Sequence, residues 1–188
     1  AVSIDVIDAA VRRIIRLQLC YELDTRPRMI DPSKLETESH LALARRVSTD
    51  AMVLLKNTQN VLPLSPFQND IVLVGPFANT SNLGDTGSSD VTPTNPVTPY
   101  AGLVDFLGED RVLLIDEPDL DAATSAFESA SVIIAVVGLS AEDEGESLLS
   151  AGDRKSMGLP APQIALLQSL AAYEAPLVVV MFGGSAIT

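Results

Sequence analysis

Residues 71–76 read Ile-Val-Leu-Val-Gly-Pro, a continuous apolar run that stops at a glycine and a proline. Three similar runs follow, at 112–115 before Asp116, at 132–137 before Gly138, and at 177–182 before Gly183. Each run is too short for a typical helix, and all of its positions are apolar. This pattern is typical of parallel strands that are buried on both faces of a sheet.

Helical patterns separate the four runs, at 100–107, 120–129 and 162–173. Alternation of strand and helix favours a parallel sheet with right-handed crossovers. The sequence therefore predicts an α/β fold with a mostly parallel sheet sandwiched by helices, a three-layer α/β/α arrangement. Ligands of such folds usually bind at the carboxyl ends of the strands.

The first third of the chain has a different pattern. Apolar residues recur at helical spacing from Ser3, a possible cap, to about residue 21. Residues 24–34 contain two prolines and read as an irregular linker. We expect a second helix over 38–55, whose apolar face consists mostly of small residues.

Composition excludes several classes of function. The net charge of −13 argues against nucleic acid and against an anionic membrane surface as partners. No apolar run approaches the ~20 residues of a membrane helix. Cys20 and His40 are the only cysteine and histidine, so an intrachain disulfide and a four-ligand Cys/His zinc site are impossible. We expect no metal and no cofactor.

The loop at 139–159 concentrates acidic residues. Crowded carboxylates raise some of one another's pKa values, as a general acid near neutral pH requires. Arg154 could hold one carboxylate ionised through a bidentate contact. A solvated acidic loop and a divalent-cation loop stay open as alternatives, although the alternating ligands of an EF-hand are missing. The crowded carboxylates are Glu142, Asp143, Glu144 and Glu146.

A second long loop, at 78–99, follows the first strand and is rich in Gly, Ser, Thr, Asn and Pro. It contains neither a G-x-G-x-x-G pattern nor a Gly-Lys-Ser/Thr pattern, so phosphate binding has little support. Contact with a neutral ligand through hydroxyls and backbone amides fits its composition better. A plain surface loop is the alternative.

Specific motifs resemble glycoside hydrolase family 3. Residues 44–47 (Ala-Arg-Arg-Val), 53–57 (Val-Leu-Leu-Lys-Asn) and 61–64 (Val-Leu-Pro-Leu) are similar to the most recognisable stretch of that family. Weaker similarity continues on both sides and covers nearly the whole chain. It includes residues 8–14, 71–76, 83–89, 144–145, 153–154, 159–163 and 177–184.

The resemblance implies a retaining β-glycosidase that hydrolyses terminal β-linked sugars from oligosaccharides or glycosides. In this family a barrel domain carries an aspartate nucleophile, and the sandwich domain usually supplies a glutamate acid/base. The implied partners are therefore an N-terminal barrel domain of the same protein and a carbohydrate. For location, the resemblance favours the periplasm or secretion.

Family similarity also assigns roles to individual residues. Glu144 fits the acid/base best, because it precedes a glycine shortly before Asp153 and Arg154; Glu142 and Glu146 are the alternatives. Asp153 and Arg154 would support the loop. The expected substrate contacts are Ser88, Ser89 and Asp85.

The implied organisation has three parts: residues 1–23 as the last helix of the barrel domain, 24–66 as linker and helix, and 67–188 as an incomplete α/β sandwich domain. No segment matches the nucleophile motif, so we expect these residues alone to be inactive. Two alternatives stay open, a non-catalytic sugar-binding or scaffolding α/β domain and a flavodoxin-like nucleotide-binding domain.

Overall fold

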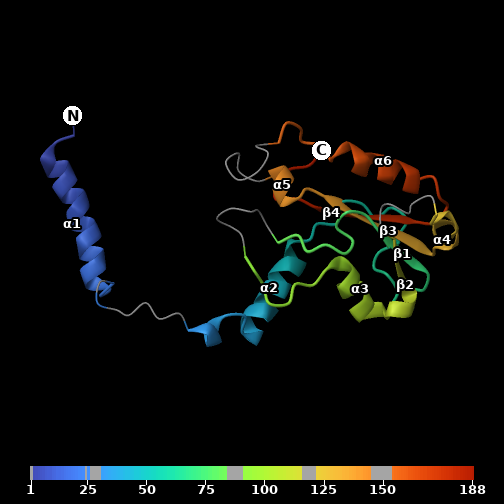
Figure 1. Ribbon diagram of the computed structural model, residues 1–188, viewed down its shortest axis with the longest axis horizontal. Coiled ribbons are helices and arrows are strands. Elements are labelled where there is room, and N and C mark those ends of the chain that lie inside the picture. The colour runs from blue at the N-terminus through green and yellow to red at the C-terminus, as the bar shows by residue number, and fades with distance from the viewer. Residues whose placement is uncertain (1, 24, 26–30, 84–90, 116–121, 145–153) are drawn as a thin grey trace. The chain divides into compact units, whose positions relative to one another are not determined.

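The computed structural model describes residues 2–23, 25, 31–83, 91–115, 122–144 and 154–188. The chain forms two compact units, Ala1–Val53 and Leu54–Thr188, which are drawn in Figure 1. No helix within the described ranges is long and apolar enough to cross a membrane.

The first unit contains the helices α1 (Ile4–Cys20) and α2 (Glu38–Ala51), with a short 3-10 helix, η1 (Pro32–Lys34), between them. Helix α1 matches its predicted bounds, although the Ser3 side chain makes no capping hydrogen bond. Thr37 caps α2 by accepting a hydrogen bond from the backbone N–H of His40.

The predicted end of α2 at residue 55 is wrong. Met52 has extended backbone angles (φ −69°, ψ 132°), so the helix ends at Ala51. The following apolar side chains, from Met52 to Leu55, are exposed. No glycine or proline marks this boundary, so the apolar pattern continues past the end of the helix.

The second unit is built on the strands β1 (Ile71–Val74), β2 (Val112–Ile115), β3 (Val132–Gly138) and β4 (Leu177–Phe182). They form one parallel sheet in the order β2-β1-β3-β4. All four predicted strands are confirmed, and β3 extends one residue further than predicted. Because all strands run in the same direction, the loops that follow β1, β3 and β4 begin at the same edge of the sheet.

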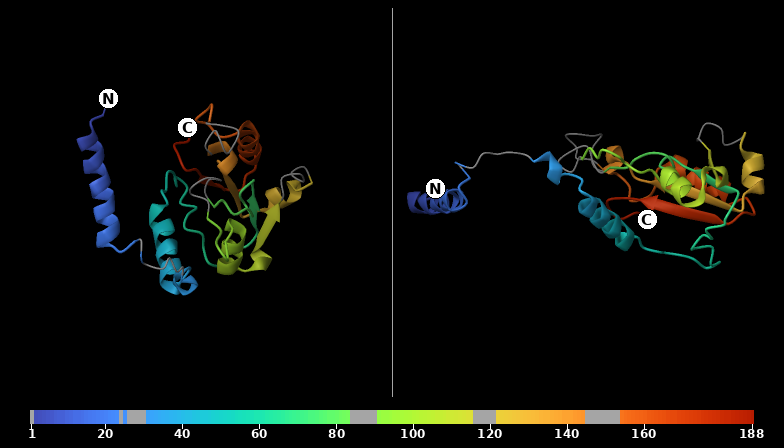
Figure 2. Two further views of the ribbon diagram at one scale, coloured as in Figure 1. Left: turned by 60° about the vertical axis from the view of Figure 1, so that its left-hand side comes forward. Right: turned by 90° about the horizontal axis from the view of Figure 1, so that it is seen from below.

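Helices cover both faces of this sheet, which confirms the three-layer α/β/α prediction. Helix α3 (Pro99–Leu107), which is followed by the 3-10 helix η2 (Glu109–Arg111), packs on one face, and α4 (Thr124–Ser129) and α6 (Ala161–Leu170) pack on the other. The short helix α5 (Ala141–Glu144) follows β3. Figure 1 shows α3 and α6 on opposite sides of the strands. Figures 1 and 2 also place α4 at the opposite end of the sheet from α5.

Alternate residues of the central strands pack into two cores. Ile71 and Leu73 point toward α3, where Leu107 is buried. Val72 and Val74 belong to the other core, with Phe127 of α4 and Leu166 and Leu170 of α6. This alternation follows from the two-residue period of a strand.

Burial on both faces holds only for the two central strands. Every residue of β1 and β3 is buried. On the outer strands, by contrast, Leu113 is 52% exposed and Val179 is 45% exposed. The apolar runs of the outer strands are similar to those of the central strands, so sequence patterning alone does not separate edge from centre.

Candidate functional site

Two glycines allow neighbouring strands to lie close together where the loops emerge, because a glycine has no side chain. Gly75 follows β1 with φ +114°, and a Cβ at this position would lie 2.3 Å from the carbonyl oxygen of Val136. Gly138 ends β3 with φ +151°, and a Cβ there would lie 2.1 Å from the carbonyl oxygen of Phe182. Only glycine fits such contacts without moving a strand.

Gln163 fixes the end of β3 from the side of α6. The backbone N–H of Gly138 donates to Gln163 Oε1 at 2.8 Å, and Gln163 Nε2 donates to the carbonyl of Gly138 at 2.9 Å. The amide is buried and uses a donor and an acceptor at once. It therefore holds the backbone at the point where the acidic loop begins.

The start of the acidic loop forms the short helix α5 rather than an irregular coil. Asp143 Oδ2 accepts hydrogen bonds from the Ser140 backbone N–H and hydroxyl, each at 2.8 Å. In return, the Asp143 N–H donates to Ser140 Oγ at 3.3 Å. This reciprocal pairing is a capping box. The pattern Ser140-Ala-Glu-Asp143 is its sequence signal, which the sequence analysis missed.

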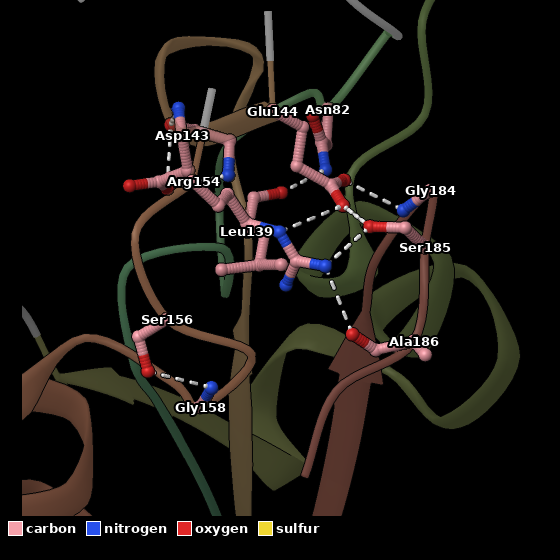
Figure 3. A network of polar contacts seen from close by, with 11 residues as sticks. Asn82, Leu139, Asp143, Glu144, Arg154, Ser156, Gly158, Gly184, Ser185 and Ala186 are labelled. Atoms are coloured by element: carbon pink, nitrogen blue, oxygen red, sulfur yellow. Dashed lines mark hydrogen bonds and ion pairs between the residues drawn. The ribbon is translucent and has the colours of Figure 1, made fainter. Parts of the chain in front are cut away.

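Glu144, the last residue of α5, faces the turn that follows β4. Its Oε2 accepts a hydrogen bond from the Gly184 N–H at 2.7 Å. Its Oε1 accepts a short hydrogen bond from the Ser185 hydroxyl and lies 4.0 Å from Arg154 Nε. Figure 3 shows these donors converging on the carboxylate. Each of its oxygens therefore accepts a hydrogen bond from the turn after β4.

Arg154 completes the network from the far end of the acidic loop. Its Nη2 donates to Ser185 Oγ at 2.7 Å and to the carbonyl of Ala186 at 3.0 Å. The side chains of Arg154 and Glu144 are each only 17% exposed, so solvent screens their attraction less than it would at an open surface. Within the described part of the chain, the buried Arg154 Nη1 has no hydrogen-bond partner.

These contacts lower the pKa of Glu144. Burial alone would raise the pKa, since it disfavours the charged form. The hydrogen bonds from Ser185 and Gly184 and the positive charge of Arg154 outweigh burial, so the net shift is downward. The arrangement holds Glu144 as an anion at neutral pH.

The loop after β1 also approaches the acidic loop. Asn82 Nδ2 donates to the carbonyl of Leu139 at 3.2 Å, and this contact spans 57 positions in the sequence. The two long loops singled out from the sequence are thus neighbours at the carboxyl edge of the sheet, as the strand polarity implies.

The predicted site residues fall into three sets. Glu144 and Arg154 lie together in the network, whereas Glu142 of α5 is exposed. Sequence reasoning missed the partners Ser185 and Asn82, because they lie 41 and 57 positions away from the groups they contact. The other predicted site residues, Asp85, Ser88, Ser89, Glu146 and Asp153, lie outside the described residues.

Comparison with known proteins agrees with this architecture. Residues 52–188 match the glycosyl hydrolase family 3 C-terminal domain. The thermostable β-glucosidase B of Acetivibrio thermocellus is 30% identical over 98% of this chain and 25% of its own length. An exo-1,4-β-xylosidase of Aspergillus niger is 34% identical over 81% of this chain and 20% of its own length.

Solved structures give the same result. The β-glucosidase of Listeria innocua in complex with glucose superposes with a TM-score of 0.79 at 26% identity. The alignment covers 97% of this chain and 26% of that protein. The chain thus spans about a quarter of the length of these relatives. The sheet, the buried core and the matched residues together establish that the chain belongs to glycoside hydrolase family 3, and residues 52–188 match the C-terminal domain of that family.

Proposed function

We propose that this chain is part of a retaining β-glycosidase and that its acidic loop supplies the general acid/base. The observation that carries the proposal is the anchoring of this carboxylate-rich loop at the carboxyl edge of the sheet, beside the turn after β4. Loops at this edge are where α/β folds place ligand-binding groups. The names of the relatives, β-glucosidase and xylosidase, favour a terminal β-linked sugar as the substrate.

Retaining hydrolysis needs two carboxyl groups about 5 Å apart. One attacks the anomeric carbon, and the other protonates the leaving oxygen and then activates water. In our proposal the nucleophile is an aspartate of an N-terminal barrel domain in the same protein, and that domain also binds the sugar. The proton donor is a glutamate of this chain, with Glu142, Glu144 and Glu146 as the candidates.

The remaining predicted residues take supporting roles in this proposal. Asp85, Ser88 and Ser89 contact the leaving-group side of the substrate, and Asp153 and Arg154 support the acidic loop. Helix α1 is the last helix of the barrel domain. Its exposed apolar side chains, among them Ile4 (67%) and Ile14 (58%), are consistent with cover from the rest of such a domain.

The test uses the complete protein with aryl β-glucosides and β-xylosides. We expect NMR of the fresh product to show the β-anomer first, because two displacements preserve configuration. Replacing Glu142, Glu144 and Glu146 together by alanine should abolish turnover of substrates with poor leaving groups. A substrate whose leaving group needs no protonation should still react. That residual reaction also serves as the folding control.

Two results would reject the proposal. An α-anomer as the first product would mean inversion rather than retention. Wild-type turnover of poor leaving groups by the triple variant would mean that the acidic loop is not the proton donor, and it would favour a purely sugar-binding or scaffolding domain.

A further inference from the structure

The turn after β4 lies directly beside the acidic loop, because β3 and β4 end together. These strands pair in parallel to the end of β4, and the Leu139 N–H continues the pairing by donating to the Phe182 carbonyl at 3.0 Å. The chain then enters α5 after β3 and the turn of residues 183–186 after β4. Glu144 and Gly184 therefore become neighbours although they are 40 positions apart.

Ser185 bridges Glu144 and Arg154. Nε of Arg154 lies 4.0 Å from Glu144 Oε1, which is too long for a hydrogen bond. The Ser185 hydroxyl closes this gap, since its Oγ accepts from Arg154 Nη2 at 2.7 Å and donates to Glu144 Oε1. Accepting a hydrogen bond from a cation makes the hydroxyl proton a stronger donor. Figure 3 shows Ser185 where these contacts meet.

The contacts on Glu144 hold its carboxylate without blocking a proton. The Gly184 N–H donates to Oε2, and the Ser185 hydroxyl donates to Oε1. A carboxylate has about four lone-pair sites, so lone pairs remain free for a proton. A Cβ on Gly184 would lie 3.1 Å from Oε2, so the glycine lets the carboxylate lie against the backbone. The turn can therefore orient Glu144 in both its protonated and its ionised form.

From this geometry we propose that Ser185 is a positioning residue for the acid/base chemistry and that it acts through Glu144. Ser185 aligns the carboxylate and transmits the charge of Arg154 to it, and the Gly184 N–H holds the second oxygen. This inference rests on the proposed function. It deepens that function by naming the residue outside the acidic loop that prepares the proton donor.

Ser185 acts on the balance between the two forms of Glu144. In the first step the carboxyl proton passes to the leaving oxygen, which also takes the electrons of the broken glycosidic bond. In the second step the carboxylate takes a proton from the attacking water. Burial raises the pKa of Glu144, but the hydrogen bonds from Ser185 and Gly184 and the charge of Arg154 lower it further than burial raises it. Ser185 therefore favours release of the proton.

The other charged groups near Glu144 are turned away from its carboxylate. On α5, Asp143 accepts hydrogen bonds from Ser140, and Glu142 is exposed. Residues 183–188 carry no titratable side chain. Within the described ranges, Arg154 is thus the cation that acts on Glu144.

The test measures kcat/KM of the complete enzyme on aryl β-glycosides of differing leaving-group acidity. We expect Ser185→Ala to lower kcat/KM by about 10-fold for poor leaving groups, the scale of one lost hydrogen bond to a charged group. A leaving group that needs no protonation should lose less than about 2-fold. Ser185→Thr should keep most of the activity, since it retains the hydroxyl. Ser125→Ala is the matched control, because Ser125 is exposed on α4, at the opposite end of the sheet from α5.

The pH profile gives a readout that a merely structural role would not change. A proton donor acts in its protonated form, so kcat/KM for poor leaving groups falls as pH rises through the pKa of Glu144. Ser185→Ala removes one of the contacts that lower this pKa. The alkaline limb of the profile should therefore move to higher pH in Ser185→Ala, and it should stay in place in Ser185→Thr and Ser125→Ala.

Two kinetic results would overturn the role of Ser185. Equal losses for all leaving groups with an unmoved alkaline limb would mean that Ser185 only stabilises the fold. Wild-type kinetics in Ser185→Ala would mean that the hydroxyl is dispensable. Either result would leave the proposed glycosidase function standing.

A wild-type protein without β-glycosidase activity would instead refute the proposed function. Carbon-13 NMR titration of the Glu144 carboxyl, assigned by the signal that is lost in Glu144→Gln, then tests the contact with Ser185 by itself. The pKa of Glu144 should be higher in Ser185→Ala than in the wild type and unchanged in Ser125→Ala. Equal pKa values in Ser185→Ala and the wild type would overturn the inference whatever the enzyme does.

Discussion

Replacing Gln163 with leucine should destabilise the α/β unit measurably, because it leaves both backbone groups of Gly138 without partners. Gln163 is only 8% exposed, and its two hydrogen bonds to Gly138 are 2.8 and 2.9 Å long. Each unpaired buried group costs about 1–3 kcal/mol. The added apolar burial of leucine returns about 1–2 kcal/mol. We therefore expect a net loss in the range of about 0–5 kcal/mol, centred near 2–3 kcal/mol.

Urea unfolding followed by circular dichroism measures this loss as a lower midpoint with an unchanged slope. Gln168→Leu is the matched control, since Gln168 is exposed on the same helix, and it should change stability by less than about 0.5 kcal/mol. Equal stability of Gln163→Leu and Gln168→Leu would refute the argument.

Gln163→Glu refines the test, because the two side chains have nearly the same shape. An ionised carboxylate can accept from the Gly138 N–H but cannot donate to the Gly138 carbonyl. Burial beside a carbonyl should raise the folded-state pKa of this glutamate above its unfolded value. The variant should therefore approach wild-type stability at low pH and lose stability as pH rises through the folded-state pKa. A deficit that is the same at every pH would contradict this.

Three further variants test the core, the strand contact and the contacts of Glu144. Phe127→Ala removes a side chain that is 1% exposed and should cost about 3–5 kcal/mol in urea unfolding, whereas Phe106→Ala, at 64% exposure, should cost under about 0.5 kcal/mol. Gly138→Ala should lower the melting temperature, because its Cβ would meet a backbone oxygen at 2.1 Å; Gly102→Ala on α3, with 3.8 Å of clearance, should be neutral or stabilising. The folded-state pKa of Glu144 lies below its unfolded value, so its ionised form stabilises the fold fully above about pH 4.3. In acid titrations the stability difference between wild type and Glu144→Gln should shrink as pH falls through the folded-state pKa, and a constant difference would argue against this.

The sequence predicts the sheet well because each strand is a continuous apolar run with a clear stop. Gly75 and Gly138 stop β1 and β3 at positions where a side chain would collide with the next strand. The same local information fails at α2, where apolar residues continue past the last helical residue, Ala51. It also fails to separate edge from central strands, since Val179 on β4 is as apolar as the buried residues of β3.

The candidate site is harder to predict, because its contacts are long-range. The acidic loop and Arg154 can be picked out locally as a cluster of opposite charges. The choice of Ser185 and Gly184 as partners of Glu144 depends on how β3 and β4 pair, and no spacing rule gives it. The position of Glu144 in a motif makes it a candidate proton donor, but the sequence alone does not reveal its contacts with Gly184, Ser185 and Arg154.

The central claim is that a glutamate of the acidic loop protonates the leaving group. It is tested most directly by azide rescue of the single variants Glu142→Ala, Glu144→Ala and Glu146→Ala in the complete enzyme. We predict that one of the three variants loses activity selectively on substrates with poor leaving groups and forms a β-glycosyl azide. If all three variants keep the wild-type ratio of rates between good and poor leaving groups and none forms the azide, the proton donor lies elsewhere and the claim is wrong.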